Sequence, residues 1–357
     1  MSKLTNSGCM RLAAVFACAL ISGSVWPLED VIDRPALISN RATQSLLLAV
    51  ARAGTRLVAA GERGVVVVSD DNGQSWHQAR VPVSVTLTSV HFVDQHNGWI
   101  TGHGGILLRS VDGGETWLKV LDGKQVAKIV LDAELANPAS AGSQHLAEAK
   151  RLVEDGPDKP LLSVYFLSPQ AGFVSGAYGL LLRTSDGGKT WFPWDQHLAD
   201  LRARHLTRIT QANGDLYIVG EQGLAYLSSD GGNTFKSMQS PYHGTFFGVA
   251  AQSEEAVIIY GLRGNAFLVG HQGKVWKQLA APAPVTFSAS TRLSSGRAII
   301  ASQTGDLLSS DGGTSLVPIR VSIHSMAADL VEASDGALIV AGRGLMRLQQ
   351  PGLQGAL

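Results

Sequence analysis

One eight-residue pattern recurs along this 357-residue chain and constrains its fold more than any other feature. The clearest copies read SVDGGETW (110–117), TSDGGKTW (184–191) and SSDGGNTF (228–235), and SDDNGQSW (69–76) is close to them. Decayed copies, VGHQGKVW and SSDGGTSL, end at Trp276 and Leu316. The large residues that end the copies lie 41, 74, 44, 41 and 40 positions apart. A period near 41 indicates a repeat architecture with one structural unit per copy.

A second signal precedes each copy: a short apolar run, a Gly-x-x-Gly-like turn and another apolar run, as in FVSGAYGLLLRT. A seventh such unit (338–348) has no octapeptide after it. Each unit reads as four short strands separated by Gly, Asp and Asn turns, which is the size of a propeller blade. We therefore predict an all-β, seven-bladed β-propeller with four-stranded blades over residues 25–350, followed by a tail at 351–357. We expect residues 31–39 to supply the missing fourth strand of the last blade and so close the ring.

The octapeptide has a structural interpretation as the turn between the third and fourth strands of a blade. Its Asp can accept hydrogen bonds from backbone N–H groups, and its paired glycines permit positive φ. The final aromatic residue would pack between blades. One carboxylate per turn is a poor ligand set, so we expect no metal there. The pattern resembles the Asp-box, or bacterial neuraminidase repeat, which implies a fold marker remote from any active site; the residues concerned are Asp71, Asp112, Asp186, Asp230, Asp311, Trp76, Trp117 and Trp191.

The first 24 residues read as a secretory signal peptide, with a positively charged start, a ten-residue apolar run (12–21) and small residues before the expected cleavage point. Both cysteines, Cys9 and Cys18, lie in this segment. A lipid anchor at Cys18 is the weaker alternative, because Phe16 is bulky where such motifs want a small residue. We expect a periplasmic protein without stable membrane insertion of its own, since no later segment is long and apolar enough to span a bilayer.

Strand order predicts which face of the ring carries variable residues. The turns between second and third strands should lie on the same face as the connections between blades, and the octapeptides on the opposite face. The alternative for each variable residue is an ordinary exposed turn. As a set they are rich in Arg, His and Tyr, which suits a recognition face; the partner-binding candidates are Arg63, His103, Tyr178, Arg202, Arg204, Tyr242, His243, Arg263 and Arg343.

The wide spacing of 74 indicates an insertion between blades two and three, at about residues 122–160. Apolar residues recur there at helical spacing on both sides of the turn NPASAGS. We expect a helical hairpin mounted on the face that carries the variable turns. Two interpretations stay open: a pad that covers the channel mouth or packs on its own blade, and a docking arm for a partner.

Composition and motifs argue against several functions. The formal charge is zero, with 29 basic and 29 acidic residues, so no nucleic-acid partner is indicated. The chain has none of the catalytic or phosphate-binding motifs of common enzymes, and we expect no catalytic, cofactor-binding or metal-binding residues. The alternative is a sialidase-like or carbohydrate-binding Asp-box hydrolase. It would need an arginine trio, for which Arg63, Arg263 and Arg343 are available, around a Tyr and Glu pair such as Tyr178 and Glu221.

The units at 102–117, 176–191 and 220–235, and above all FVSGAYGLLLRTSDGGKTW, resemble the photosystem II stability and assembly factor family. The resemblance covers about residues 30–350. It implies a non-enzymatic propeller that binds a membrane protein or complex on its non-cytoplasmic side, here the periplasmic one, and we expect the chain to be a monomer. An arginine-rich patch is implicated in that family, and the candidates here are Arg63, Arg202, Arg204, Arg263 and Arg343. The resemblance does not make photosystem II the default client, and an envelope transport protein is the other candidate; the helical insertion departs from the family pattern.

Overall fold

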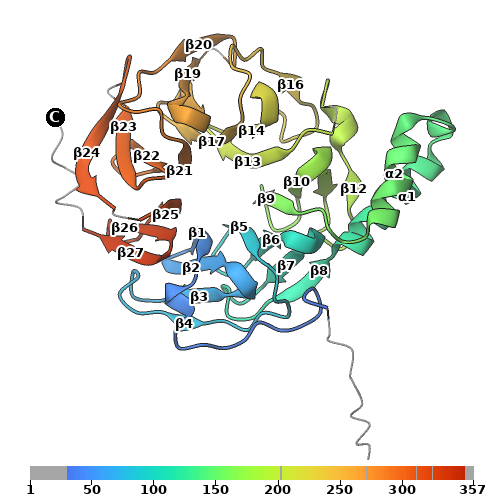
Figure 1. Ribbon diagram of the computed structural model, residues 1–357, viewed down its shortest axis with the longest axis horizontal. Coiled ribbons are helices and arrows are strands. Elements are labelled where there is room, and N and C mark those ends of the chain that lie inside the picture. Colours follow the sequence, from blue (N-terminus) through green and yellow to red (C-terminus); the bar gives the residue numbers. More distant parts are fainter. Residues whose placement is uncertain (1–29, 202, 271, 311, 324, 350–357) are drawn as a thin grey trace, which may run out of the picture.

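The computed structural model describes residues 30–349 except 202, 271, 311 and 324, and its strands form a closed ring of seven antiparallel sheets (Figure 1). Within these residues, six sheets have four strands and one has three. The predicted seven-bladed propeller is therefore confirmed. The expected signal peptide (1–24) and tail (351–357) lie outside the described residues.

Each blade is a meander of consecutive strands. Blades 1 and 2 comprise β1 (Leu47–Ala53), β2 (Arg56–Gly61), β3 (Val66–Ser69) and β4 (His77–Gln78), then β5 (Leu87–Phe92), β6 (Gly98–Gly102), β7 (Leu107–Ser110) and β8 (Leu118–Leu121). Blades 3 and 4 comprise β9 (Leu161–Phe166), β10 (Gly172–Gly176), β11 (Leu181–Thr184) and β12 (Phe192–Pro193), then β13 (Leu206–Ala212), β14 (Asp215–Gly220), β15 (Ala225–Ser228) and β16 (Lys236–Ser237). Blades 5 and 6 comprise β17 (Phe246–Ala251), β18 (Ala256–Gly261), β19 (Ala266–Gly270) and β20 (Val275–Gln278), then β21 (Phe287–Arg292), β22 (Ala298–Ser302), β23 (Asp306–Ser310) and β24 (Leu316–Ser322). Blade 7 comprises β25 (Ala327–Glu332), β26 (Leu338–Gly342) and β27 (Gly344–Leu348).

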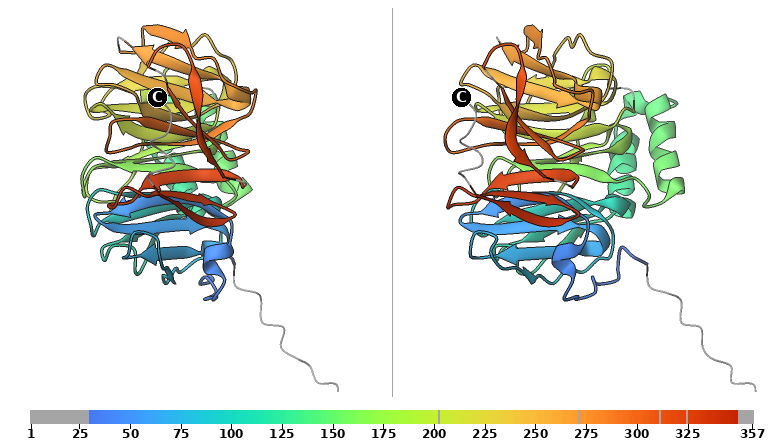
Figure 2. Two further views of the ribbon diagram at one scale, coloured as in Figure 1. Left: turned by 90° about the vertical axis from the view of Figure 1, so that its left-hand side faces the viewer. Right: turned by 60° about the vertical axis from the view of Figure 1, so that its left-hand side comes forward.

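The first strand of each blade lies nearest the ring centre, and the blades stack around it as a thick disc (Figures 1 and 2). Second strands are buried along their whole length in blades 2, 3, 6 and 7, and in blades 1, 4 and 5 all but their first residue is buried, because both of their faces meet a neighbouring blade. Seven apolar clusters fill the seven interfaces between blades. One of them joins Leu57 of blade 1 to Ile339 of blade 7, so apolar packing closes the ring.

The octapeptide around Asp186 shows the bonding that the sequence predicts. The Asp186 carboxylate accepts hydrogen bonds from the backbone N–H of Thr190 (3.0 Å), the Thr190 hydroxyl (2.6 Å) and the Thr184 hydroxyl (2.9 Å). The indole N–H of Trp191 donates to the Gly188 carbonyl at 3.1 Å. Both glycines of the turn have positive φ. Equivalent carboxylate bonds recur at Asp71, Asp112 and Asp230, whereas Asp311 lies outside the described residues.

These bonds stabilise the charged carboxylates. Hydrogen bonds from Ser75 lower the pKa of Asp71 to about 2, and those from Thr190 lower the pKa of Asp186 to about 2. The terminal aromatic residues lie in the clusters between their own blade and the preceding one: Trp117 belongs to the cluster between blades 1 and 2, and its ring centroid lies 5.9 Å from that of Phe92 in its own blade. In the copies around Asp71, Asp112, Asp186 and Asp230, the carboxylate bonds hold the turn between the third and fourth strands of the blade.

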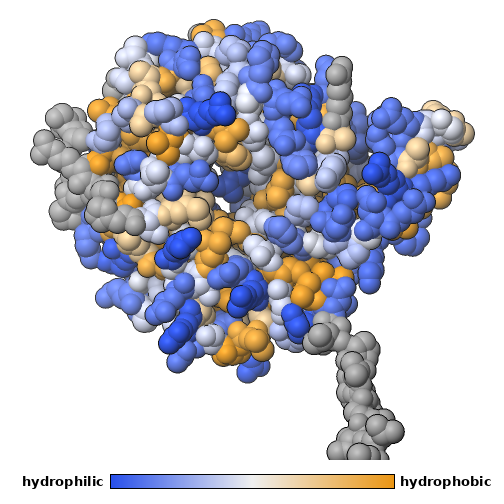
Figure 3. All heavy atoms as spheres, viewed as in Figure 1, coloured by the Kyte–Doolittle hydropathy of each residue, from blue (hydrophilic) through white to orange (hydrophobic). Residues whose placement is uncertain are grey.

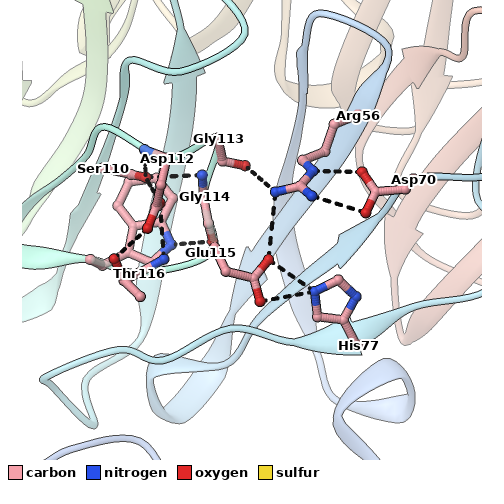
Figure 4. A network of polar contacts seen from close by, with 10 residues as sticks. Arg56, Asp70, His77, Ser110, Asp112, Gly113, Gly114, Glu115 and Thr116 are labelled. Carbon is pink, nitrogen blue, oxygen red and sulfur yellow. Dashed lines mark hydrogen bonds and ion pairs between the residues drawn. The ribbon is translucent and has the colours of Figure 1, made fainter.

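A charged network also ties the second octapeptide to blade 1 (Figure 4). The guanidinium of Arg56 makes two hydrogen bonds to Asp70, at 2.7 and 2.9 Å, and donates to the Gly113 carbonyl at 3.4 Å. Glu115 lies 3.5 Å from Arg56 and 3.0 Å from the ring nitrogen of His77. Because these partners are partly exposed, the network orients the turn more than it stabilises the fold.

The prediction that residues 31–39 form the fourth strand of blade 7 is wrong. Among the described residues β27 is the outermost strand of that blade. The segment lies instead against blades 1 and 2, where the Ala36 N–H donates to the Val81 carbonyl at 3.0 Å. Ile32, only 3% exposed, joins the apolar cluster between these two blades. Burial of this apolar side chain offsets the conformational entropy that is lost when the segment is ordered, and so explains why the segment lies against blades 1 and 2.

The insertion forms the two expected helices, α1 (Gly123–Ala136) and α2 (Gln144–Asp155). Asp122 caps α1 in a capping box with Gln125, and Ser143 caps α2. The hairpin lies beside the outer rim of blade 3, away from the ring centre (Figures 1 and 2), whereas the sequence suggested a mount on the ring face. Its apolar side, including Val126 and Leu152, packs into the cluster between blades 2 and 3. In the described part of the chain, no helix has the length and hydrophobicity needed to cross a bilayer.

Candidate functional site

The turns between second and third strands share one backbone design. Five of them are single 3-10 turns: η2 (Glu62–Gly64), η3 (His103–Gly105), η5 (Ala177–Gly179), η7 (Glu221–Gly223) and η8 (Leu262–Gly264). The glycine that ends the second strand is required by space, since a Cβ on Gly61 would overlap the Leu46 carbonyl. The next residue, Glu62, donates its N–H to that same carbonyl at 2.9 Å. The first glycine of the sequence pattern thus lets the blade's entering strand pass close to the turn.

The second glycine of the pattern lets the connection between blades cross the turn. The Gly64 N–H donates to the Val85 carbonyl, and the Gly223 N–H donates to the Gly244 carbonyl, both at 2.7 Å. Both acceptors belong to segments that lead into the next blade. The turns and the connections therefore lie on one side of the ring, as the strand order predicted. We call this side, made of these turns, residues 303–305 and 343–344 and the blade connections, the connection face.

The middle residue of each turn has the left-handed conformation. In blades 1, 3 and 5 it is Arg63, Tyr178 or Arg263, with φ near 55°. Bulky residues rarely adopt this conformation, which costs on the order of 1–2 kcal/mol. Blade 2 has Gly104 at the same position, beneath the methyl group of Ile32. Arg63 and Arg263 are exposed, and Tyr178 is 56% exposed. Strained exposed residues of this kind are typical of binding surfaces.

The structure divides the predicted partner-binding residues into two groups. Exposed side chains on the connection face are those of Arg63, His103, Tyr178, His243, Arg263 and Arg343. Arg204 is instead held by its own loop, because its guanidinium donates to the carbonyls of Asp200 and Leu201. Tyr242 donates its hydroxyl to the Leu262 carbonyl at 3.2 Å and packs 5.2 Å from the ring of Phe246. Arg202 lies outside the described residues.

Seen from the side drawn in Figure 1, the ring presents many hydrophilic side chains around a central hollow (Figure 3). Tyr178 is the aromatic member of the exposed set on the connection face, and the ammonium of Lys159 lies 5.0 Å from its ring centroid. Its edge meets the ring of His205 at 5.0 Å. Cations and one exposed aromatic ring on the same face are a pattern suited to protein recognition.

The glutamates of two turns have structural roles. Glu62 accepts the backbone N–H of Leu46 at 3.0 Å, and Glu221 accepts that of His205 at 2.8 Å. These are equivalent bonds in blades 1 and 4, so each carboxylate fastens the turn of its own blade. Within the described residues, no group of three or more His, Cys, Asp or Glu is arranged to hold a metal ion.

Sequence reasoning missed a polar group on the inner strands. Arg208 on β13 lies 3.7 Å from Asp329 on β25 and so joins blades 4 and 7. Burial raises the pKa of Asp329, although its carboxylate also accepts the N–H of Val50 at 3.1 Å. Burial lowers the pKa of His91 on β5 to about 4, and the charge of Arg208 adds to this effect. The sequence signal that could have revealed this group is the isolated charged residue Arg208 in the first strand of blade 4.

Comparisons with known proteins agree with the geometry. The family model described as photosynthesis system II assembly factor YCF48 matches residues 35–111, 68–132 and 145–313. Photosystem II stability/assembly factor HCF136 of Arabidopsis thaliana is 22% identical over 257 residues, which cover 61% of this chain and 63% of that protein. Photosystem II assembly protein Ycf48 of Synechococcus sp. (strain JA-3-3Ab) is 28% identical over 138 residues, which cover 32% of this chain and 39% of that protein. The chain thus spans about three-fifths or less of these two relatives.

Solved structures show the same fold. The structure of YCF48 bound to D1 peptide has a TM-score of 0.63 at 17% identity and covers 88% of this chain and 99% of that one. A streptogramin B lyase has a TM-score of 0.64 at 10% identity and covers 85% of this chain and 94% of that one. An assembly factor and a lyase resemble this chain equally well in shape, so these similarities show the fold alone.

Proposed function

Because the chain belongs to the Ycf48 family of photosystem II assembly factors, we propose that it is a non-enzymatic periplasmic propeller that binds a membrane protein or complex and assists its assembly. The partner is an integral membrane protein whose non-cytoplasmic segments reach the propeller. Photosystem II subunits and envelope transporters both belong to this class, and the experiment below distinguishes them.

The observation that carries this proposal is the row of exposed side chains on the connection face. Arg63 and Arg263 occupy equivalent left-handed positions that glycine would fill with less strain. Arg343 is exposed at the corresponding turn of blade 7. Three cations at equivalent turns suit acidic segments of a partner, and charged partners attract each other over distances of about 10 Å.

A hydrolase of the sialidase type is less well supported. It would need carboxylates free to act as acid and base. Glu62 and Glu221 each accept a backbone N–H of their own blade instead. Tyr178 has Lys159 as its close charged neighbour, and this cation is paired with Asp155 and Asp158.

The test is affinity purification from detergent-solubilised membranes of the native host, followed by mass spectrometry. The key variant reverses three charges on the connection face: Arg63→Glu, Arg263→Glu and Arg343→Glu. The matched control reverses three exposed lysines in or beside the octapeptides, Lys189→Glu, Lys236→Glu and Lys274→Glu. Both variants change the net charge equally. A difference in the amount of partner that co-purifies is therefore due to the face on which the charges lie and not to the net charge.

We expect a membrane protein to co-purify with the native chain and with the lysine variant, and to be lost with the arginine variant. Its identity then decides between a photosystem subunit and a transporter. If no membrane protein is enriched over a tag-only sample, or if both variants retain it equally, the proposed function is wrong. Circular dichroism of both variants confirms that the propeller is intact.

A further inference from the structure

The helical insertion and blade 3 form the walls of an open cavity of about 380 Å³, near the lower end of the range of ligand pockets. Its walls are largely apolar, with Val130 and Leu152 from the helices facing Leu180 and Leu182 from blade 3. Tyr178 and Gly179 also line it, so the cavity reaches the connection face.

Two carboxyl groups from different elements line this cavity. Glu134 comes from the last turn of α1, and Asp195 follows β12. Burial raises the pKa of Asp195, and the charge of Glu134 raises it further, while His145 opposes the effect. One oxygen of Glu134, Oε2, is buried and has no hydrogen-bond partner within the described part of the chain. A buried carboxylate oxygen without a donor is costly, which indicates that a donor belongs there.

The cations that line the cavity do not neutralise this pair. Lys159 Nζ lies 3.1 Å from Asp155 and 2.7 Å from Asp158. Arg151 lies 3.9 Å from Asp155 and is largely exposed. Within the described residues, no ion pair or hydrogen bond joins either cation to Glu134 or Asp195. The cavity therefore combines apolar walls with two carboxyl groups that neither Lys159 nor Arg151 pairs with.

We propose that this cavity binds a lysine or arginine side chain of the partner protein, an inference that rests on the proposed function. The alkyl stem of such a side chain would lie against Leu152 and Leu180, and its charged head would donate to Glu134 and Asp195. Charge-assisted hydrogen bonds of this kind are about twice as strong as neutral ones, and more so where water is excluded. The arginines of the connection face would then bind acidic groups of the partner, and this acidic cavity would bind a basic side chain of the same partner.

The test uses two short probes, acetyl-Leu-Lys-Leu-amide and the same peptide with norleucine in place of lysine, titrated into the full chain by calorimetry. The key variant is E134Q/D195N, which keeps the size and shape of both side chains. Asp132→Asn is the control, since Asp132 pairs with Lys128 on the exposed side of α1. Melting temperatures should show that E134Q/D195N is at least as stable as the native chain, because two facing carboxyl groups are neutralised.

We expect the lysine peptide to bind the native chain at least tenfold more tightly than the norleucine peptide. E134Q/D195N should lose that preference, and Asp132→Asn should keep it. Equal binding of both peptides, an undiminished preference in E134Q/D195N, or no binding of either peptide each overturns the proposal. Failure here is separable from failure of the proposed function, because the membrane purification compares variants at arginines and lysines and leaves Glu134 and Asp195 unchanged.

Discussion

Replacing the left-handed arginines by glycine should stabilise the propeller while it weakens partner binding. Arg63 and Arg263 have φ near 55°, and the left-handed region costs a residue other than glycine about 1–2 kcal/mol. A glycine at this position relieves that strain, but it also makes the unfolded chain more flexible. The added flexibility lowers the stability by about 0.4–1 kcal/mol and offsets part of the gain. Each Arg→Gly variant should therefore be about 1 kcal/mol more stable than the matching Arg→Ala variant. Blades 1 and 5 are separate, so the two gains should add to about 2 kcal/mol.

The assay is calorimetric melting of the Gly and Ala variants beside the purification of the partner. Both variants lack the guanidinium, so both should bind the partner more weakly, and only the glycine variants should melt higher. A difference of about 2 °C per site is expected for a domain of this size. Gln222, exposed and with φ near 55°, is the uncharged control: its Gly and Ala variants should show the same stability difference with no loss of binding. If glycine and alanine melt alike at all three sites, the strain argument fails.

Three further results are expected. Asp186→Asn should lower the melting temperature at neutral pH. Because the pKa of Asp186 is lowered to about 2 in the folded chain, the stability that its carboxylate contributes is present above pH 4 and is lost as the pH falls toward 2. Melting curves of the variant and the native chain should therefore converge near pH 2. Gly223→Ala should prevent stable folding, because its Cβ would overlap a carbonyl oxygen of the crossing connection, whereas Gly214→Ala, with open space around it, should cost only about 1–2 kcal/mol in a calorimetric comparison. Arg208→Met should cost about 3–5 kcal/mol by leaving the buried Asp329 without its cation, and adding Asp329→Asn should restore most of that loss; equal stability of single and double variants would contradict the pairing.

The repeat made most of the fold predictable. A blade needs its turn glycines and its octapeptide bonds in every copy, so local rules recur in the sequence and can be read from it. The bonds of Asp186 and the crossing at Gly64 follow directly from those residue types. The shared connection face follows from strand order alone.

Long-range contacts were not predictable in the same way. Residues 31–39 have an apolar pattern that fits a strand, yet Ile32 fills a space between blades 1 and 2 that only the assembled ring defines. Arg208 and Asp329 lie on different blades, and no spacing in the sequence relates them. The hairpin helices were predictable from their periodicity, but their place on the rim depends on the apolar side of blade 3.

Under the proposed function, departures from the repeat would decide which partner the propeller binds. Seven similar blades would present seven similar turns, and such a surface could not distinguish one orientation of a partner from another. Here the left-handed position holds Arg63 in blade 1, glycine in blade 2, Tyr178 in blade 3 and Arg263 in blade 5, on a backbone that barely changes. The insertion adds an acidic cavity beside Tyr178 alone. If both proposals hold, the positive turns and the negative cavity together define a direction across the molecule and fix how a charged segment of the partner lies on it.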